Sequence, residues 1–408
     1  MSIRLRFELR IMSETAFSLG PLTVSFSEDP FCCNTLETMY GDFPESSSNA
    51  DIQVTGYNWR ETKIPPNCIV RASDQISVDD NLHRVDEVHS YSSPQKWIID
   101  KIGQRGYALL IDGWNKETLS VDVYYDGKLY ENTMTPLRYF LKFKDWTFAN
   151  YRDKLAKNFV YNIFEPICQA WMLKKGVTFL HAGSISVDGY GVALTGWGGA
   201  GKTSAASALI KQSDKVNFLS DDLAIINTQA ELYPYYKSSV IYPYNTEGEN
   251  ISESDFLDGF SDKLQWNIHK WRNGNKGVRR RVSPKKLFGE QVGSPGPRTL
   301  EQVVYLSREK RDKLDHESIT SEELARRSTA VILNELDWLV EYSSTIRAAG
   351  STSIDPYNII QKTERIYQDS FDEAETVLLR IPKNTPPNEL AEYLKQSVIG
   401  TGQSFQME

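Results

Sequence analysis

The chain has 408 residues, of which 40% are hydrophobic, 12% aromatic and 25% charged, and its formal net charge is -8. These values are those of a folded globular protein long enough for two or three domains, so extensive disorder is not expected. The negative charge disfavours a nucleic-acid-binding protein, because such a protein needs an excess of Lys and Arg on one face.

Other features of the sequence predict a cytoplasmic protein. No run approaches the roughly 18 apolar residues of a membrane span. Charges interrupt the apolar positions of the first residues, MSIRLRFELR, unlike those of a signal peptide. We therefore expect neither a membrane partner nor secretion. The cysteines, at positions 32, 33, 68 and 168, lack CxxC spacing and a nearby His, which favours reduced thiols over a zinc site or a disulfide framework.

Residues 1–145 are predicted to form a β-rich N-terminal domain. Apolar and polar residues alternate with the period of half-buried strands in four segments, 3–10, 22–26, 51–55 and 119–125. An apolar run at 106–112 and the turn at Asp126-Gly127 predict hairpins, because Asp-Gly readily supplies the positive φ angles of tight turns.

Residues 146–310 are predicted to form the catalytic domain. Its first helix is expected to begin near Asp145, to continue to about 176 and to be kinked or broken by Pro166, which lacks an N–H donor and clashes with the preceding turn. Strand, turn, strand, glycine-rich loop, helix and strand then follow between 177 and 226. This alternation is typical of an α/β nucleotide-binding core.

The strongest motif is a glycine-rich loop that matches G-x-x-x-x-G-K-[ST], formed by Gly196, Trp197, Gly198, Gly199, Ala200, Gly201, Lys202 and Thr203 and followed by Ser204. Glycines allow the backbone curvature that points several N–H groups at phosphate oxygens. The Lys202 ammonium can reach the β- and γ-phosphates, the Thr203 hydroxyl can ligate Mg²⁺, and the following helix directs its N-terminus at the same anion. We therefore expect these residues to bind ATP and Mg²⁺, although the sequence does not distinguish ATP from another phosphoryl donor.

Three residues around this loop are candidates for catalysis beside Lys202. Asp221 and Asp222 follow an apolar segment downstream, where carboxylates commonly hold hydrated magnesium or accept a proton from a hydroxyl. We expect at least one to be catalytic, with Asp222 and Thr203 as magnesium ligands; the alternative is that both cap the end of a strand or a turn. His181 follows an apolar segment upstream, where a lone histidine is more often structural.

A polar segment at about 244–298 is rich in Asn, Gly, Ser and charge, and we interpret it as a functional loop. It contains the basic run from Lys276 to Arg281. One of the arginines at 279–281 could stabilise negative charge on a transferred phosphoryl group, because a guanidinium is planar and always ionised. The alternative is a solvated basic loop.

Residues 311–408 are predicted to form a C-terminal extension, helical or α/β, packed on the core. A strand at 301–306 precedes it. Thr320 and Glu323 have the spacing of a capping box, and apolar residues follow at helical intervals, which predicts one helix over 321–342. A strand at 375–381 and a short helix at 388–398 complete the chain.

The run from Phe179 to Ile226 resembles the C-terminal kinase domain of HPr kinase/phosphorylase. The resemblance rests on His181-Ala182 at a strand end, the partly kept Gly189-Tyr190-Gly191-Val192 segment, the P-loop and the double Asp. It implies a phosphoenolpyruvate-carboxykinase-like core, α/β within an α+β chain, with a mixed sheet. It also implies that Lys202 binds phosphate, Thr203 ligates magnesium, Asp221 or Asp222 is the general base and His181 is the active-site histidine. The family's magnesium-binding glutamate segment is not recognisable here, so the second metal ligand is unassigned.

The sequence favours an ATP-dependent kinase that phosphorylates a hydroxyl of a small molecule or of a serine in a peptide or protein. A paired Asp suits a hydroxyl acceptor. The alternative is a nucleotide-gated interaction protein, in which nucleotide orders the 244–298 segment and the front domain recruits a partner. Carboxykinase chemistry would require further metal-ligating His and Lys residues, which we do not find. The sequence leaves open the acceptor, the role of the C-terminal extension and whether the chain forms a homo-oligomer.

Overall fold

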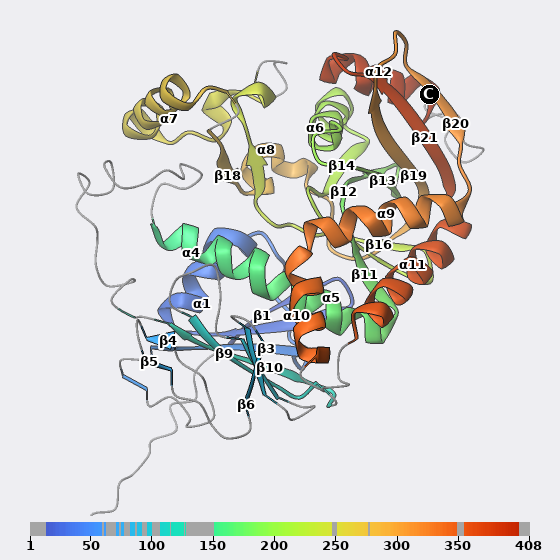
Figure 1. Ribbon diagram of the computed structural model, residues 1–408. Helices are drawn as coiled ribbons and strands as arrows, with labels where there is room; N and C mark the ends of the chain where they lie inside the picture. Colours follow the sequence, from blue (N-terminus) through green and yellow to red (C-terminus); the bar gives the residue numbers. More distant parts are fainter. Residues whose placement is uncertain are drawn as a thin grey trace, which may run out of the picture.

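The computed structural model describes residues 14–58, 61–62, 71–72, 75–76, 82–85, 88–91, 96–99, 107–114, 116–125, 127, 151–246, 251–275, 278–348 and 355–399. The described chain contains several sheets, some of them mixed, together with helices, so the predicted combination of α and β structure is confirmed (Figure 1). The strand predicted at 3–10 and Asp126 of the predicted turn lie outside the described residues. No helix among the described residues has both the length and the apolar character needed to cross a membrane.

The N-terminal part of the chain contains a six-stranded sheet in the order β1-β2-β3-β10-β9-β8. Its strands are β1 (Glu14–Leu19), β2 (Leu22–Ser27), β3 (Ile52–Asn58), β8 (Lys96–Ile99), β9 (Tyr107–Asp112) and β10 (Leu119–Tyr125). The strands predicted at 22–26, 51–55, 106–112 and 119–125 are therefore confirmed. Ile52, Val54 and Gly56 are buried, and Gln53 and Thr55 between them are half-buried, as the period of two requires.

Short elements complete this part of the chain. Two-stranded sheets are formed by β4 (Arg71–Ala72) with β5 (Gln75–Ile76) and by β6 (Leu82–Val85) with β7 (Val88–Tyr91). Helix α1 (Pro30–Thr35) begins where the Asp29 side chain accepts hydrogen bonds from the N–H groups of Phe31 and Cys32, and it leads into the π-helix η1 (Leu36–Tyr40). Tyr40 at the end of η1 is buried, and its hydroxyl lies 3.2 Å from the hydroxyl of Tyr235.

The second sheet has nine strands, seven of them in the order β11-β15-β16-β19-β13-β12-β14. Its strands are β11 (Val177–Leu180), β12 (Ala182–Val187), β13 (Tyr190–Gly196), β14 (Val216–Ser220), β15 (Ala224–Asn227), β16 (Glu231–Tyr233), β19 (Arg298–Glu309), β20 (Asp315–Ser318) and β21 (Glu375–Pro382). The sheet is mixed, because β19 runs parallel to β13 and β21 while the other pairings are antiparallel. The strand predicted at 375–381 thus belongs to the same sheet as the strands around the P-loop.

The predicted site residues lie where two strand pairings of this sheet end. The ladder between β11 and β15 ends at Leu180 and Ala224, and the ladder between β12 and β14 begins at Ser184 and Ser220. The connecting residues therefore lie opposite each other: His181 on one side and the two aspartates on the other. β12 also pairs with β13, so both connections lie beside the strand that leads into the P-loop.

The helix before this sheet is not broken at Pro166. Helix α4 (Tyr151–Phe159) continues through the π-helix η2 (Val160–Phe164) into α5 (Glu165–Met172) and the 3₁₀ turn η3 (Leu173–Lys175). Pro166 lies in the first turn of α5, and the wide π turn just before it accommodates the missing N–H donor. The predicted break is thus wrong, because the helix changes type instead, whereas the alternative of a kink at Pro166 stays a prediction.

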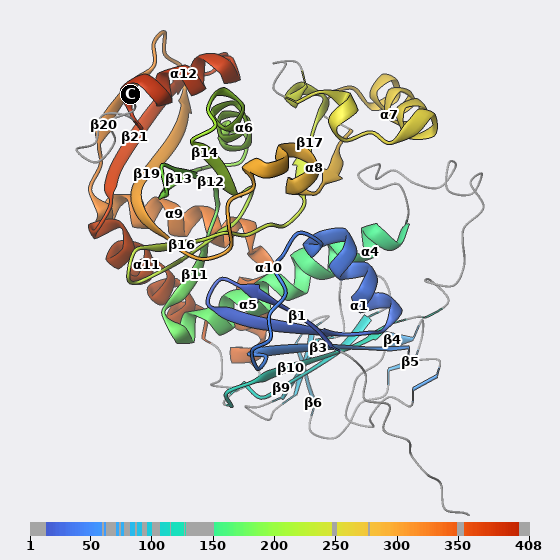
Figure 2. The same cartoon turned by 180° about the vertical axis from the view of Figure 1, so that it is seen from behind.

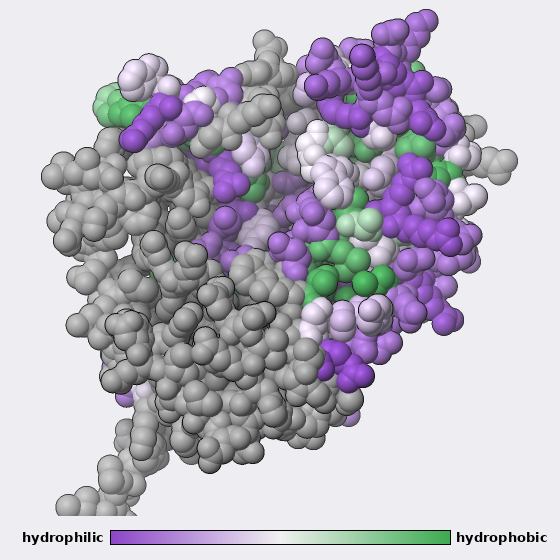
Figure 3. Space-filling model, in the orientation of Figure 1, coloured by the Kyte–Doolittle hydropathy of each residue, from purple (hydrophilic) through white to green (hydrophobic). Residues whose placement is uncertain are grey.

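The helix predicted over 321–342 is two helices, α9 (Ser321–Glu335) and α10 (Asp337–Ala348). The predicted cap is present, because Thr320 Oγ1 accepts a hydrogen bond of 3.2 Å from the Glu323 N–H. Leu336 leaves the helical region with ψ of 43° and ends α9 at Glu335. Helices α11 (Pro356–Asp372) and α12 (Pro387–Ser397) follow, and hydrophilic residues cover much of the face of α9, α11 and α12 in Figure 3.

The segment 244–298, interpreted from its composition as a loop, is largely structured. Its described elements are the 3₁₀ turn η5 (Glu253–Asp255), helix α7 (Gly259–Asn273), strand β18 (Arg280–Val282), helix α8 (Pro284–Phe288) and the 3₁₀ turn η6 (Gly289–Gln291). Strand β18 pairs with β17 (Ser239–Ile241) (Figure 2). The 3₁₀ turn η4 (Pro243–Asn245) lies between β17 and η5. A small core of its own includes Trp266, Val282 and Leu287. Exposed apolar residues on the other face of α7, Phe260 and Trp271, obscured the helical period in the sequence.

Candidate functional site

The P-loop connects the end of β13 to the start of α6 (Lys202–Gln212). Gly196, Gly199 and Gly201 have φ angles of 131°, 81° and 109°, which L-residues rarely adopt. At Gly196 a Cβ atom would also lie 2.5 Å from the Leu306 carbonyl oxygen on the neighbouring strand β19. Three of the motif's glycines are therefore required for the backbone conformation, and Gly196 is also required for the close approach of β13 and β19.

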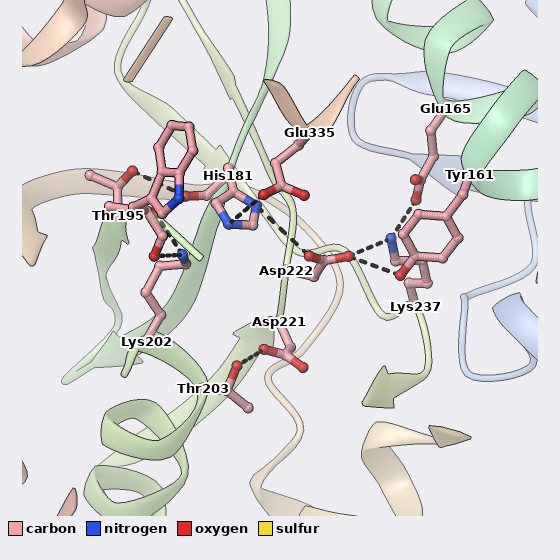
Figure 4. Close-up of polar contacts among 12 residues, drawn as sticks. Tyr161, Glu165, His181, Thr195, Lys202, Thr203, Asp221, Asp222, Lys237 and Glu335 are labelled. Atoms are coloured by element: carbon pink, nitrogen blue, oxygen red, sulfur yellow. Dashed lines mark hydrogen bonds and ion pairs between the residues drawn. The ribbon is translucent and has the colours of Figure 1, made fainter. Parts of the chain in front are cut away.

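The Lys202 ammonium is folded across the loop. Its Nζ donates to the carbonyl oxygens of Gly196 at 2.7 Å and Trp197 at 3.1 Å, and the residue is 7% exposed (Figure 4). Burial lowers the pKa of Lys202 to about 8, against the opposing effect of Asp222, Glu335 and Asp221. A cation held among carbonyl oxygens in this way can move to phosphate oxygens without first losing a full hydration shell.

At the predicted phosphate site, nucleotide affinity is expected to fall as the pH rises above about 8, because the free protein then loses the proton on Lys202. Phosphates favour the charged ammonium, so binding raises the pKa of this group. Between the free and bound pKa the affinity should fall by up to about tenfold per pH unit. Calorimetric titration on both sides of that pKa measures this. In Lys202→Arg the cation does not titrate in this range, so an equal pH dependence in that variant would contradict the assignment.

Thr203 and Asp221 form the next contact along the site. Thr203 Oγ1 donates to Asp221 Oδ1 at 2.6 Å, and Asp221 is buried. Burial raises the pKa of Asp221, and the hydrogen bond from Thr203 partly offsets this effect. Ser204 accepts a hydrogen bond of 3.1 Å from Asn245 Nδ2, which ties the start of α6 to the 244–298 segment.

Asp222 points away from Thr203 and toward a cluster of polar residues (Figure 4). Its φ angle is 74°, a strained value for a residue other than glycine. The Oδ2 atom accepts hydrogen bonds from Tyr161 at 2.9 Å and from Lys237 Nζ at 3.0 Å. Burial by itself would raise the pKa of Asp222, but Lys237 and further cations reverse this and hold the pKa below its usual value, so the carboxylate is ionised at neutral pH.

Lys237 links Asp222 to the helix in front of the sheet. Its Nζ also donates to Glu165 Oε1 at 2.5 Å, and both side chains are 1% exposed. The same glutamate oxygen accepts a hydrogen bond of 2.7 Å from Tyr235, whose hydroxyl lies 3.2 Å from that of Tyr40 in the front part of the chain. Burial would lower the pKa of Lys237, but Glu165 and its other neighbours outweigh this and raise it.

The arginines of the basic run have different positions. Arg281 contacts the Tyr161 hydroxyl and donates to the Ser238 carbonyl oxygen at 2.9 Å, so it belongs to the cluster around Asp222. Arg280 instead forms an ion pair with Asp262 and a 2.6 Å hydrogen bond to Gln265 on α7. The prediction that one arginine contacts phosphate stays a prediction; Arg281 shares a hydrogen-bond partner, Tyr161, with Asp222.

His181 lies between two carboxylates. Its Nδ1 is 3.8 Å from Asp222 Oδ1 and its Nε2 is 3.6 Å from Glu335 Oε1, both too long for hydrogen bonds. Burial, followed by the charge of Lys202, lowers the pKa of His181 to about 4, so the ring is neutral at physiological pH. Burial and then Asp222 raise the pKa of Glu335. These three side chains form a set that could hold a metal ion.

The structure brings together all the residues predicted to be catalytic, namely His181, Lys202, Asp221 and Asp222, with Thr203. Four other members of the site were missed: Tyr161, Glu165, Lys237 and Glu335. No local sequence pattern marks Tyr161, Glu165 or Lys237 as a member of the site. Glu335 is marked by a weak pattern, because an acidic residue at the last position of a helix interacts unfavourably with the helix dipole. Comparisons of the sequence with protein-family models and with curated proteins found no match.

Proposed function

We propose that the protein transfers the γ-phosphoryl group of ATP to a hydroxyl group, either of a small molecule or of a serine in a peptide or protein. The observation that carries this proposal is the position of the ionised Asp222 on the turn that also carries Asp221, the partner of Thr203 in the P-loop. A triphosphate site and a carboxylate for the acceptor would thus lie side by side. The mixed sheet around the P-loop also supports a carboxykinase-like core, as in HPr kinases.

Thr203 and Asp221 are suited to hold Mg²⁺, because a hydroxyl and a carboxylate offer the oxygen ligands that this ion prefers. Bound there, Mg²⁺ would neutralise negative charge on the nucleotide. Lys202 would exchange the carbonyl oxygens of Gly196 and Trp197 for phosphate oxygens. The amides of the loop would point at the same phosphates, so a preformed set of donors would bind the nucleotide.

Asp222 is better suited to orient an acceptor hydroxyl than to be a strong base. A carboxylate with a lowered pKa has little affinity for a proton, whereas a base acts best with a pKa near the working pH. Phosphoryl transfer through a loose transition state needs little proton abstraction at an early stage, so orientation is the larger contribution. One lone pair of the oxygen that neither Tyr161 nor Lys237 contacts, Oδ1, would accept the hydrogen bond from the hydroxyl, which leaves the other lone pair of Oδ1 free.

Asp222→Asn is expected to lower phosphoryl transfer by about 100-fold or more. The protein is incubated with labelled ATP, Mg²⁺ and a cell extract, and label in extract components is compared with free phosphate. Asp312→Asn, at an exposed position far along the chain, is the matched control and should behave as wild type. Release of phosphate without any transfer, unchanged in Asp222→Asn, would contradict the kinase and favour a nucleotide-gated switch.

A further inference from the structure

Within the described part of the chain, no side chain forms a hydrogen bond with the imidazole of His181, although this ring is almost completely buried. The residue is 5% exposed, and neither Nδ1 nor Nε2 makes a side-chain hydrogen bond to a described residue. Buried polar atoms are nearly always paired, because a polar atom that loses its water without gaining another partner destabilises the fold. Two buried ring nitrogens without a side-chain partner therefore leave this position open to a ligand.

Three distant parts of the chain bring their side chains together at this point. His181 lies between β11 and β12, Asp222 lies between β14 and β15, and Glu335 ends α9. One ligand atom from each lies within 4.8 Å of the others (Figure 4). The distances of 3.6 Å and 3.8 Å from the ring to the two carboxylates are too long for direct bonds but suit groups that share an ion.

We propose that His181, Asp222 and Glu335 bind a divalent transition-metal cation, of the class of Mn²⁺ or Zn²⁺, in addition to any magnesium that accompanies the nucleotide. One neutral imidazole and two carboxylates supply a nitrogen ligand and two negative charges. Mg²⁺ and Ca²⁺ prefer sites made of oxygen alone, whereas imidazole favours transition metals. The nitrogen of His181 thus distinguishes this site from the one near Thr203.

The two metal positions use different carboxylates. Asp221 is directed at Thr203, and Asp222 is directed at His181 and Lys237, so neighbouring residues on one turn face opposite sides (Figure 4). The left-handed conformation of Asp222 produces this divergence. Because Glu335 belongs to the C-terminal segment, the cation would join that segment to the P-loop core. The inference does not depend on the proposed phosphoryl transfer, since it concerns binding without nucleotide.

The test is a titration of chelator-treated protein with Mn²⁺ in the absence of nucleotide, followed by electron paramagnetic resonance. Wild type is expected to bind one Mn²⁺ with nitrogen hyperfine couplings from His181, and Zn²⁺ should displace it. Glu335→Gln should weaken Mn²⁺ binding by at least about tenfold. Glu322→Gln, on an exposed part of the same helix, is the matched control and should leave it unchanged.

A second variant separates this inference from the proposed function. Lys202→Ala should lose nucleotide binding and keep Mn²⁺ binding, because Lys202 is not a member of the cluster. Wild type that binds neither Mn²⁺ nor Zn²⁺ would overturn the metal site. Binding that is equal in wild type and Glu335→Gln, or that lacks nitrogen couplings, would overturn it too, since the ion would then lie elsewhere. Neither result would affect the kinase proposal.

Discussion

Lys202→Ala is expected to weaken nucleotide binding by about 100-fold or more. The ammonium is buried in the loop and would make charge-assisted hydrogen bonds to phosphate, each contributing about 1.5–3 kcal/mol. Without Lys202, the backbone amides of the loop would bind the negatively charged triphosphate without the positive charge of the lysine. Calorimetry or fluorescence titration with a non-hydrolysable triphosphate measures the change. The loss of affinity should be accompanied by loss of phosphoryl transfer.

The matched control for this variant is Lys211→Ala. Lys211 lies in the last turn of the same helix, α6, and pairs with Asp255 at 3.4 Å, so its removal also takes away one lysine without reaching the loop. Its nucleotide affinity should equal that of wild type. If Lys202→Ala bound nucleotide as tightly as Lys211→Ala, the P-loop assignment would be wrong, and with it the proposed kinase.

The second large effect is expected for Lys237→Met. The ammonium is shared by the fully buried Glu165 and by Asp222, so its loss leaves two carboxylates near each other without their common cation. Breaking a buried ion pair from one side destabilises a protein by about 3–5 kcal/mol. The midpoint of urea unfolding should therefore fall markedly. The pKa of Asp222 should also rise toward its usual value, because Lys237 is the largest of the influences that lower it.

A double variant tests whether the lost charge pairing is the cause. Adding Glu165→Gln to Lys237→Met removes the stranded negative charge, so the double variant should recover part of the lost stability, and the two changes should be non-additive. Lys215→Met is the surface control: its side chain is 52% exposed, and the change is expected to stay within about 0.5 kcal/mol of wild type. Additive losses would show that Lys237 stabilises the fold by packing alone.

Restoring the cation tests the role of Lys237 in positioning Asp222. Lys237→Arg keeps the positive charge and should retain more transfer activity than Lys237→Met. If both variants lost activity in proportion to their loss of folded protein, the positioning role would be excluded. A changed pH profile of transfer in Lys237→Met, at a temperature where it is folded, is the result expected of a shifted Asp222 pKa.

Local patterns were sufficient for much of the fold. The strands at 119–125 and 375–381 and the cap at Thr320 depend on neighbouring residues, and all are present. The prediction of one helix over 321–342 was wrong in one respect, because α9 ends before Leu336 and α10 follows. No helix breaker marks that position in the sequence. The segment 244–298 was misread, because α7 carries apolar residues on two faces and its composition resembles that of a loop.

What the sequence by itself determined about this protein is its P-loop, because eight consecutive residues specify the backbone angles, the cation and the hydroxyl of that site. The tertiary structure alone decided which groups surround Asp222. Lys237 and Glu165 are 72 residues apart, and Tyr161 and Asp222 are 61 apart, so no periodicity along the chain links them. Such contacts depend on how strands are ordered in a sheet. Burial then keeps His181 neutral, whereas the neighbouring Lys237 keeps Asp222 ionised against the effect of burial.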